Sequence, residues 1–317
     1  MTDDVRSQAI LEPARPGEPI GNSGSRMPNA FFAWAPLIVL PAAVLLLVPA
    51  TWPRWACMWA IAIALYSGCK WLTWRTASVH GAPAWKHAGY LLAWPGLDAD
   101  AFLSPPGAVA TKRPDLGEWL FALGKLALGA VILFAVTRLV PARYPYLVGW
   151  AAMIGIVMIL HFGLFHLLSC GWRSVGVEAK PLMNWPLAAT NVSEFWGKRW
   201  NTAFRDLTHR FLFRPLAARL GARGAILAGF AFSGLVHELV VSVPAGGGYG
   251  GPTLFFAIQG AAIFSERSKP GRKAGLGKGW TGWLFTAFVL LAPAYGLFHP
   301  PFVESVVVPF VRALGAI

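Results

Sequence analysis

The residues best suited to chemistry lie together in an apolar stretch, Ala231-Phe-Ser-Gly-Leu-Val-His237-Glu238. His237 is 13 residues into an apolar run that begins near residue 224, which is about 20 Å along a helix. An ionisable pair at that depth in a membrane is costly unless it faces protein or water, so it indicates function. Ser233 lies one turn earlier on the same helix face, within bonding range of the imidazole. The alternative is a neutral histidine bonded to a neighbouring helix.

The chemistry that His237 suits is proton transfer. An ordinary histidine has a pKa of about 6.5 and can take a proton from a hydroxyl as that hydroxyl attacks a carbonyl group. Burial favours the neutral imidazole, which is ready to accept a proton.

Metal chemistry has less support. His161 and His166 are five residues apart, so they point about 140° apart on a helix, and we expect packing or interfacial roles for them. The three cysteines, at positions 57, 69 and 170, have no CxxC spacing. We therefore expect no metal site, no disulfide framework and no cofactor.

The composition places these residues in a membrane protein. Of the 317 residues, 56% are hydrophobic and 13% are charged, about half the usual charged share of roughly 25%. The apolar residues form long runs, as hydrocarbon surroundings require, and the 16 Trp and 25 Pro fit the same class. The net charge of +13 does not indicate nucleic acid, because the basic residues lie between the apolar runs.

The predicted fold is an all-α integral membrane protein with about seven or eight transmembrane helices. Residues 1–30 are polar and predict a disordered tail, and residues 31–317 predict one transmembrane domain. The expected spans are near 31–50, 55–74, 118–139, 146–170, 224–243, 251–265 and 280–297, and the run 302–315 is either an eighth span or an interfacial helix.

Alternate connections between these runs are rich and poor in Lys and Arg, 21 residues against 4. The rich connections are expected in the cytoplasm together with the N-terminus. Two of them, 75–117 and 171–223, are long and contain short apolar pieces, which predicts re-entrant or interfacial segments. The basic stretch 204–220 is consistent with an interfacial helix or with a dock for a phosphorylated carrier.

Two motifs carry a resemblance to a known family. Ser193-Glu-Phe-Trp-Gly-Lys-Arg-Trp-Asn201, with His237 following 36 residues later in Ser233-Gly-Leu-Val-His-Glu238, resembles the wax synthase branch of the membrane-bound O-acyltransferase (MBOAT) superfamily. Trp94-Pro-Gly-Leu-Asp98 and Phe255-Phe-Ala-Ile-Gln259 add to it. The resemblance covers roughly residues 85–315.

The resemblance implies a helical fold around a buried tunnel, in which a carrier-linked acyl chain meets an alcohol at a buried histidine. The matching positions are His237, as general base, and Asn201, as donor to the oxyanion or as orienter of the imidazole. We expect the nearby residues Glu238, Ser233, Trp196, Trp200 and Arg199 to support the site or bind substrate. A thioester is already activated, so no covalent acyl-enzyme is required.

The predicted function is transfer of an acyl group from acyl-CoA, as co-substrate, to a hydrophobic alcohol within membrane lipid. One alternative is a transporter or lipid-handling protein without chemistry, although no internal repeat supports it. Another is N- or S-acylation on the same fold.

Overall fold

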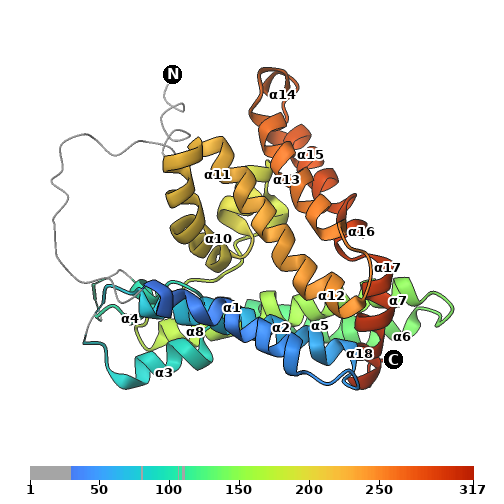
Figure 1. Cartoon of the computed structure of the whole chain (residues 1–317), viewed down its shortest axis with the longest axis horizontal. Coiled ribbons are helices and arrows are strands. Elements are labelled where there is room, and N and C mark those ends of the chain that lie inside the picture. Colours follow the sequence, from blue (N-terminus) through green and yellow to red (C-terminus); the bar gives the residue numbers. More distant parts are fainter. Residues whose placement is uncertain (1–29, 80, 106, 109–110) are drawn as a thin grey trace.

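The computed structural model describes residues 30–79, 81–105, 107–108 and 111–317, and these residues form helices and loops without a β-strand (Figure 1). An all-helical fold is thus confirmed for the described residues. The tail predicted over residues 1–30 lies outside them, except for Ala30, where the first helix begins.

Each predicted apolar run coincides with helix. In chain order the helices are α1 (Ala30–Leu47), α2 (Arg54–Arg75), α3 (Ala84–Ala93), α4 (Ala99–Leu103), α5 (Leu116–Val131), α6 (Thr137–Leu139), α7 (Pro145–Val157), α8 (Phe165–Ser174), α9 (Val192–Glu194), α10 (Thr202–Thr208), α11 (Arg214–His237), α12 (Val243–Ala245), α13 (Gly251–Arg267), α14 (Lys269–Lys273), α15 (Gly279–Leu291), α16 (Ala294–Leu297), α17 (Pro300–Phe302) and α18 (Val308–Ala313).

Short π-helical stretches join several of these into longer rods, such as η2 (Met158–Leu164) between α7 and α8. Among the described residues, five helices are long and apolar enough to cross a membrane: Arg54–Arg75, Leu116–Leu139, Pro145–Ser174, Thr202–Ala245 and Gly279–Leu297. The first helix is also apolar but is shorter over its described residues.

The longest rod differs from the predicted boundaries. The expected span 224–243 is the second part of a helical run of 44 residues from Thr202 to Ala245, and the basic stretch 204–220 is the first part. The two parts meet at Gly221, whose φ of 69° is non-helical and breaks the rod. Glycine adopts this backbone conformation without steric cost, so the break falls where the sequence allows it.

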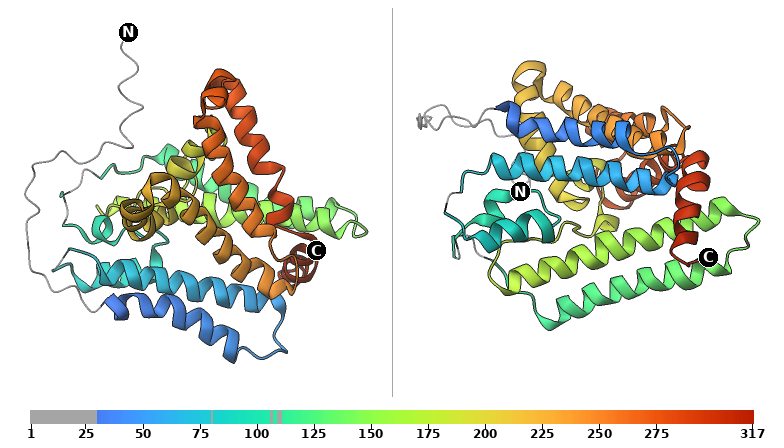
Figure 2. Two further views of the ribbon diagram at one scale, coloured as in Figure 1. Left: turned by 45° about the horizontal axis from the view of Figure 1, so that its top comes forward. Right: turned by 60° about the horizontal axis from the view of Figure 1, so that its bottom comes forward.

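The helices pack in two groups. In Figure 1, α1, α2, α5 and α7 run across the lower half of the molecule, and α10, α11, α13 and α15 lie above them. The second panel of Figure 2 shows α1 beside α2, and α5 beside the α7–α8 rod. Small residues allow the latter pair to approach closely, because a Cβ on Gly163 would lie 2.8 Å from Leu126 Cα.

Side-chain bonds join the connections in two separate sets. At one end, Asp100 accepts from Ser78 N at 2.6 Å and from Arg210 Nη1 at 2.9 Å, and Arg173 donates to the Lys112 carbonyl at 3.2 Å. We call this the basic end, because its connections, 76–115 and 175–201, contain six Lys and Arg, whereas the opposite connections 48–53, 140–144 and 246–250 contain one, Arg143.

At the opposite end, Arg54 donates to the Ala245 carbonyl and to Ser305 Oγ, the latter at 3.3 Å. Arg138 Nε donates to the Ala316 carbonyl at 3.1 Å. Successive rods therefore run in opposite directions between the two ends, and the connections at the basic end contain more Lys and Arg than those at the other end.

The loops of the basic end have a core of their own. Tyr90, Trp94 and Phe102 are buried against Val177 and Leu182, so the two long connections pack on each other. The Trp94–Asp98 motif is extended here, and its Gly96 carbonyl accepts from Lys70 Nζ at 2.6 Å. Residues from both connections also line a large cavity within the described part of the chain.

Candidate active site

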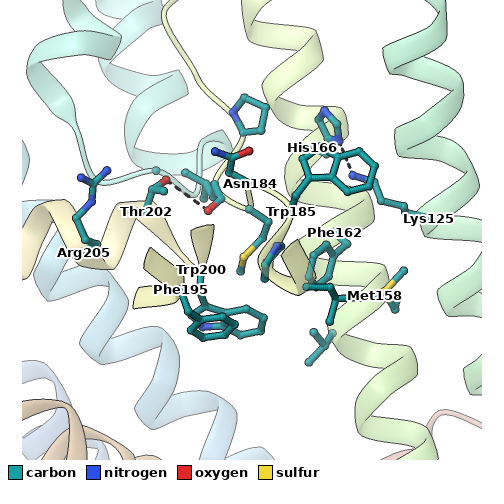
Figure 3. Close-up of a pocket in the computed structure, with 18 of the residues that line it drawn as sticks. Lys125, Met158, Phe162, His166, Asn184, Trp185, Phe195, Trp200, Thr202 and Arg205 are labelled. Atoms are coloured by element: carbon teal, nitrogen blue, oxygen red, sulfur yellow. Dashed lines mark hydrogen bonds between the residues drawn. The ribbon is translucent and has the colours of Figure 1, made fainter. Parts of the chain in front are cut away.

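A cavity of about 1400 Å³ opens between the α5 and α7–α8 rods, the 179–206 segment and α15 (Figure 3). This volume exceeds the usual range of roughly 300–1,000 Å³ for a ligand pocket. Its charged lining belongs to the basic end and its neighbouring helix turns. It comprises six cationic side chains, Lys112, Lys125, Arg173, Lys180, Lys198 and Arg205, and four carboxylates, Asp98, Glu118, Glu178 and Asp206. Its opposite part is apolar, with Met58, Trp59, Trp150, Met153, Phe302 and Phe310. The cavity thus suits a ligand with one charged and one apolar end.

His237 is the last residue of α11 and is oriented by its own helix. Its Nδ1 lies 2.7 Å from the Ser233 carbonyl, which only accepts, so Nδ1 carries the proton. The ring packs on Phe256 with centroids 4.6 Å apart. Because Nδ1 is the donor, Nε2 carries the lone pair, as a general base requires. Ser233 supports His237 through its carbonyl, while its hydroxyl donates to the Gly229 carbonyl at 3.0 Å.

Glu238 faces the turn between α12 and α13. Its Oε1 accepts from Gly250 N at 2.9 Å, Thr253 N at 3.0 Å and Thr253 Oγ1 at 2.9 Å. Its Oε2 is buried and has no partner among the described residues. Glu238 therefore holds the start of α13, which carries Phe256, against the end of α11.

The second motif is held by its own polar side chains. Asn201 has a φ of 41°, and its Oδ1 accepts from Phe204 N at 3.3 Å to cap α10. This use of Oδ1 leaves the Nδ2 donor without a described hydrogen bond. Arg199 pairs with Glu194 at 2.7 Å and donates to the Trp185 carbonyl at 3.1 Å, so it clamps the loop before the motif.

The surroundings of Glu194 favour the ionised form of its carboxyl group. Burial raises the pKa of its carboxyl, but the hydrogen bonds from Thr190 and Arg199 outweigh burial and hold that pKa below its ordinary value. The carboxylate is therefore ionised and available to Arg199 at neutral pH.

A run of aromatic rings connects the two motifs. Trp200 stacks on Phe195 at 5.6 Å, Phe195 meets Trp196 at 5.0 Å, Trp196 meets Phe256 at 5.6 Å, and Phe256 meets His237. Phe195 and Trp200 line the cavity, and Figure 3 shows them stacked at its wall.

His237 and Asn201 themselves are not part of the cavity lining. Within the part of the chain that the structure describes, no hydrogen bond or ring contact joins one to the other. The aromatic run is thus the described connection between the predicted base and the cavity.

Comparison with known proteins bears on this segment. Residues 179–258 match the membrane bound O-acyl transferase family. A long-chain-alcohol O-fatty-acyltransferase of Simmondsia chinensis is 35% identical over 74 residues, 21% of each chain. Probable long-chain-alcohol O-fatty-acyltransferase 1 of Arabidopsis thaliana is 26% identical over 178 residues, 51% of this chain and 50% of the relative. Acyl-CoA–sterol O-acyltransferase 1 of Arabidopsis thaliana is 30% identical over 71 residues, 20% of this chain and 21% of the relative.

The resemblance to the wax synthase-like branch of the membrane-bound O-acyltransferases is confirmed. The chain spans about half or less of the length of these curated relatives. The family match contains both predicted motifs, with Asn201 and His237.

The sequence prediction missed a polar network that lies outside the family match and lines the cavity. His166 Nδ1 lies 2.6 Å from Lys125 Nζ, and its Nε2 lies 2.9 Å from Glu118 Oε1, which Arg173 also contacts. Figure 3 shows Lys125 and His166 meeting at the cavity wall. A packing role does not describe His166, because both of its nitrogens have polar partners.

The same network includes ligand types that metals use. Ligand atoms of Glu118, His166 and Cys170 lie within 4.8 Å of one another. Lys125 and Arg173, however, already contact the imidazole and the carboxylate. Two cations beside three donors oppose a further cation electrostatically, so the arrangement fits a charged wall better than a metal centre.

Proposed function

We propose that this chain is a membrane O-acyltransferase that transfers an acyl group from acyl-CoA to the hydroxyl of a hydrophobic alcohol. The observation that carries the proposal is the His237 ring, whose Nδ1 is bonded to the Ser233 carbonyl and whose Nε2 is free to accept a proton. It lies within residues 179–258, which match the membrane bound O-acyl transferase family, and the chain is similar to relatives that are named long-chain-alcohol and sterol O-acyltransferases.

In the proposed reaction, the alcohol oxygen attacks the thioester carbonyl while His237 Nε2 takes the hydroxyl proton. The tetrahedral intermediate then collapses, the carbon–sulfur bond breaks, and the CoA thiolate takes the proton from the imidazolium. Asn201 Nδ2 is a free donor suited to the developing oxyanion, because Oδ1 is occupied in capping α10. The ester and free CoA are the two products, and no other reactant is needed.

The cavity suits these substrates. Its charged part suits the phosphate-bearing carrier and its apolar part suits a long hydrocarbon chain. In this proposal the cavity serves as the tunnel and the basic end faces the cytoplasm. The shorter helices α1 and α13 bring the five long spans to seven, and the stretch from α17 to α18 is either the eighth span or an interfacial helix. The alcohol must reach Nε2 past the aromatic run that includes Phe256 and Trp196.

The test is a direct assay of purified protein in detergent. Palmitoyl-CoA and hexadecanol should yield free CoA thiol and hexadecyl palmitate in equal amounts, measured with a thiol reagent and by mass spectrometry. A panel of shorter alcohols, terpenoid alcohols and sterols defines the acceptor. Thiol release without ester would indicate thioester hydrolysis, and silence across the whole panel would refute the proposal and favour lipid handling without chemistry.

A further inference from the structure

One imidazole in the membrane-spanning part of the chain, that of His161, has no polar partner among the residues that the structure describes. His161 lies in η2, within the Pro145–Ser174 rod. Its Nδ1 is fully buried, and no described residue forms a hydrogen bond with Nδ1 or with Nε2. The side chain keeps part of its surface exposed. Because Nδ1 is covered, Nε2 is the nitrogen that a ligand can reach.

An unpartnered imidazole at this depth needs a physical explanation. A buried polar group without a partner is destabilising by about 1–3 kcal/mol, and native structures contain few of them. Packing alone does not explain it, since an apolar residue would pack there without this cost. A polar partner that is present only with substrate would explain it.

The surroundings of His161 are those of the cavity. Its ring lies parallel to that of Trp200, with centroids 6.3 Å apart and an interplanar angle of 16°. Met158 and Phe162, three residues before and one residue after it, line the cavity together with Trp200 (Figure 3). The π-helical form of η2 is also a feature often found at functional sites.

His161 and His237 are consequently the two ends of one run of rings. The run passes from His161 to Trp200 and Phe195, then through Trp196 and Phe256 to His237. The His161 end is the one whose neighbours line the cavity. His161, like His237, is not itself a lining residue, but its ring contacts the lining residue Trp200 directly, whereas His237 contacts Phe256, which is not in the lining. A substrate in the cavity is therefore separated from His161 by fewer rings than from His237.

We propose that His161 binds the acceptor alcohol, with its Nε2 hydrogen-bonded to the alcohol hydroxyl. This inference rests on the proposed function. A hydroxyl both donates and accepts, so it pairs with Nε2 in either tautomer, whereas a thioester carbonyl pairs only with an N–H. Lys112 and Lys180, which suit the acyl carrier, line the cavity from the connections of the basic end and not from the η2 helix that carries His161. His161 thus selects the acceptor and binds its hydroxyl at the cavity end of the aromatic run, before the alcohol moves on to His237 Nε2, where the proton transfer of the proposed function takes place.

The experiment compares His161→Phe, which keeps a ring against Trp200, with His161→Gln, which restores a polar group. In His161→Phe, the KM for hexadecanol should rise about tenfold or more, while the KM for palmitoyl-CoA changes less than about twofold, as expected for one lost hydrogen bond that leaves a buried group unpaired. His161→Gln should recover most of that loss. The matched control is His209→Phe, because His209 also stacks on a ring, that of Phe213 at 16°, but Phe213 does not line the cavity, whereas Trp200 beside His161 does.

A second measurement does not depend on turnover. Diethyl pyrocarbonate modifies accessible histidines, and the His161 peptide can be quantified by mass spectrometry. Hexadecanol should protect His161 at least about threefold better than hexadecane, which has the same length but no hydroxyl, and His209 should show no such difference. Protection without any ester formation would refute the proposed function and keep the alcohol site. Ester formation with no specific protection, or with an unchanged KM for hexadecanol in His161→Phe, would overturn the inference.

Discussion

Replacing His237 with alanine tests the proposed mechanism most directly. The substitution removes the only side-chain nitrogen that is oriented to accept a proton at the end of α11. General base catalysis typically contributes 10²–10⁴-fold, so kcat should fall by about that factor. This corresponds to about 3–5 kcal/mol in the activation free energy. The protein should still insert, because the change removes a polar side chain from a membrane-spanning helix.

The structural effect of the same substitution should be smaller. The His237→Ala protein loses one hydrogen bond to the Ser233 carbonyl, which contributes about 0.5–1.5 kcal/mol to the free energy of unfolding. It also loses one ring contact with Phe256, which contributes a similar amount. The control is Ser233→Ala. Its hydroxyl bonds the Gly229 carbonyl and not the imidazole, so kcat should stay within about threefold of the parental value.

The assay measures CoA release and ester formation on protein that elutes as a single peak from size-exclusion chromatography. Ester formation by a folded His237→Ala protein at the parental rate would remove His237 as the base. A Ser233→Ala protein as inactive as His237→Ala would show that the hydroxyl takes part, contrary to the bond that it makes here.

Three further predictions concern the frame of the site. In a cysteine-free background, Gly247→Cys and Lys273→Cys should be labelled by membrane-impermeant maleimide from opposite sides, with Lys273 cytoplasmic; labelling from one side would overturn the topology. Glu238→Ala should lower the thermal midpoint in detergent more than Glu238→Gln, since glutamine keeps an acceptor for the three bonds from Gly250 and Thr253, and equal midpoints would contradict that role. Burial lowers the pKa of His299, an effect that the Glu238 carboxylate only partly offsets, so the unfolded chain binds a proton more readily than the folded one. Stability should therefore be full above about pH 6.5 and fall as the pH drops below it, and His299→Asn should flatten that dependence in thermal melts.

The helices could be predicted because each apolar run has to satisfy its own backbone groups in hydrocarbon, so the runs near 118–139 and 146–170 coincide with rods. Their ends were less predictable. The rod that carries His237 begins at Thr202, and the sequence did not predict this start. The residues before Gly221 are basic, and they lack the long apolar run that marks a span, so nothing in the sequence joins them to the span at 224–243.

The two motif residues His237 and Asn201 could be singled out because their neighbours in the chain carry the pattern. The network of Glu118, Lys125 and His166 could not. His166 is 41 residues from Lys125 and 48 from Glu118, and only the packing of two rods brings the three together. Spacing along one helix says nothing about a partner on another, which is why His166 resembled a packing residue.

The two histidines at the ends of the aromatic run differ in a way that assigns them different tasks. The Ser233 carbonyl fixes the proton of His237 on Nδ1, so its Nε2 is an acceptor before any substrate arrives. His161 has no described partner on either nitrogen, so nothing in the protein selects its tautomer. A general base needs a fixed tautomer, because its lone pair must already point at the proton it removes. A group that binds a hydroxyl does not need a fixed tautomer, because the hydroxyl can rotate to donate to or accept from either form. In the proposed function, the protein thus has one imidazole, His237, that is set in advance for proton transfer and one, His161, that adapts to the alcohol. Of the two, His161 is separated from the cavity by fewer rings.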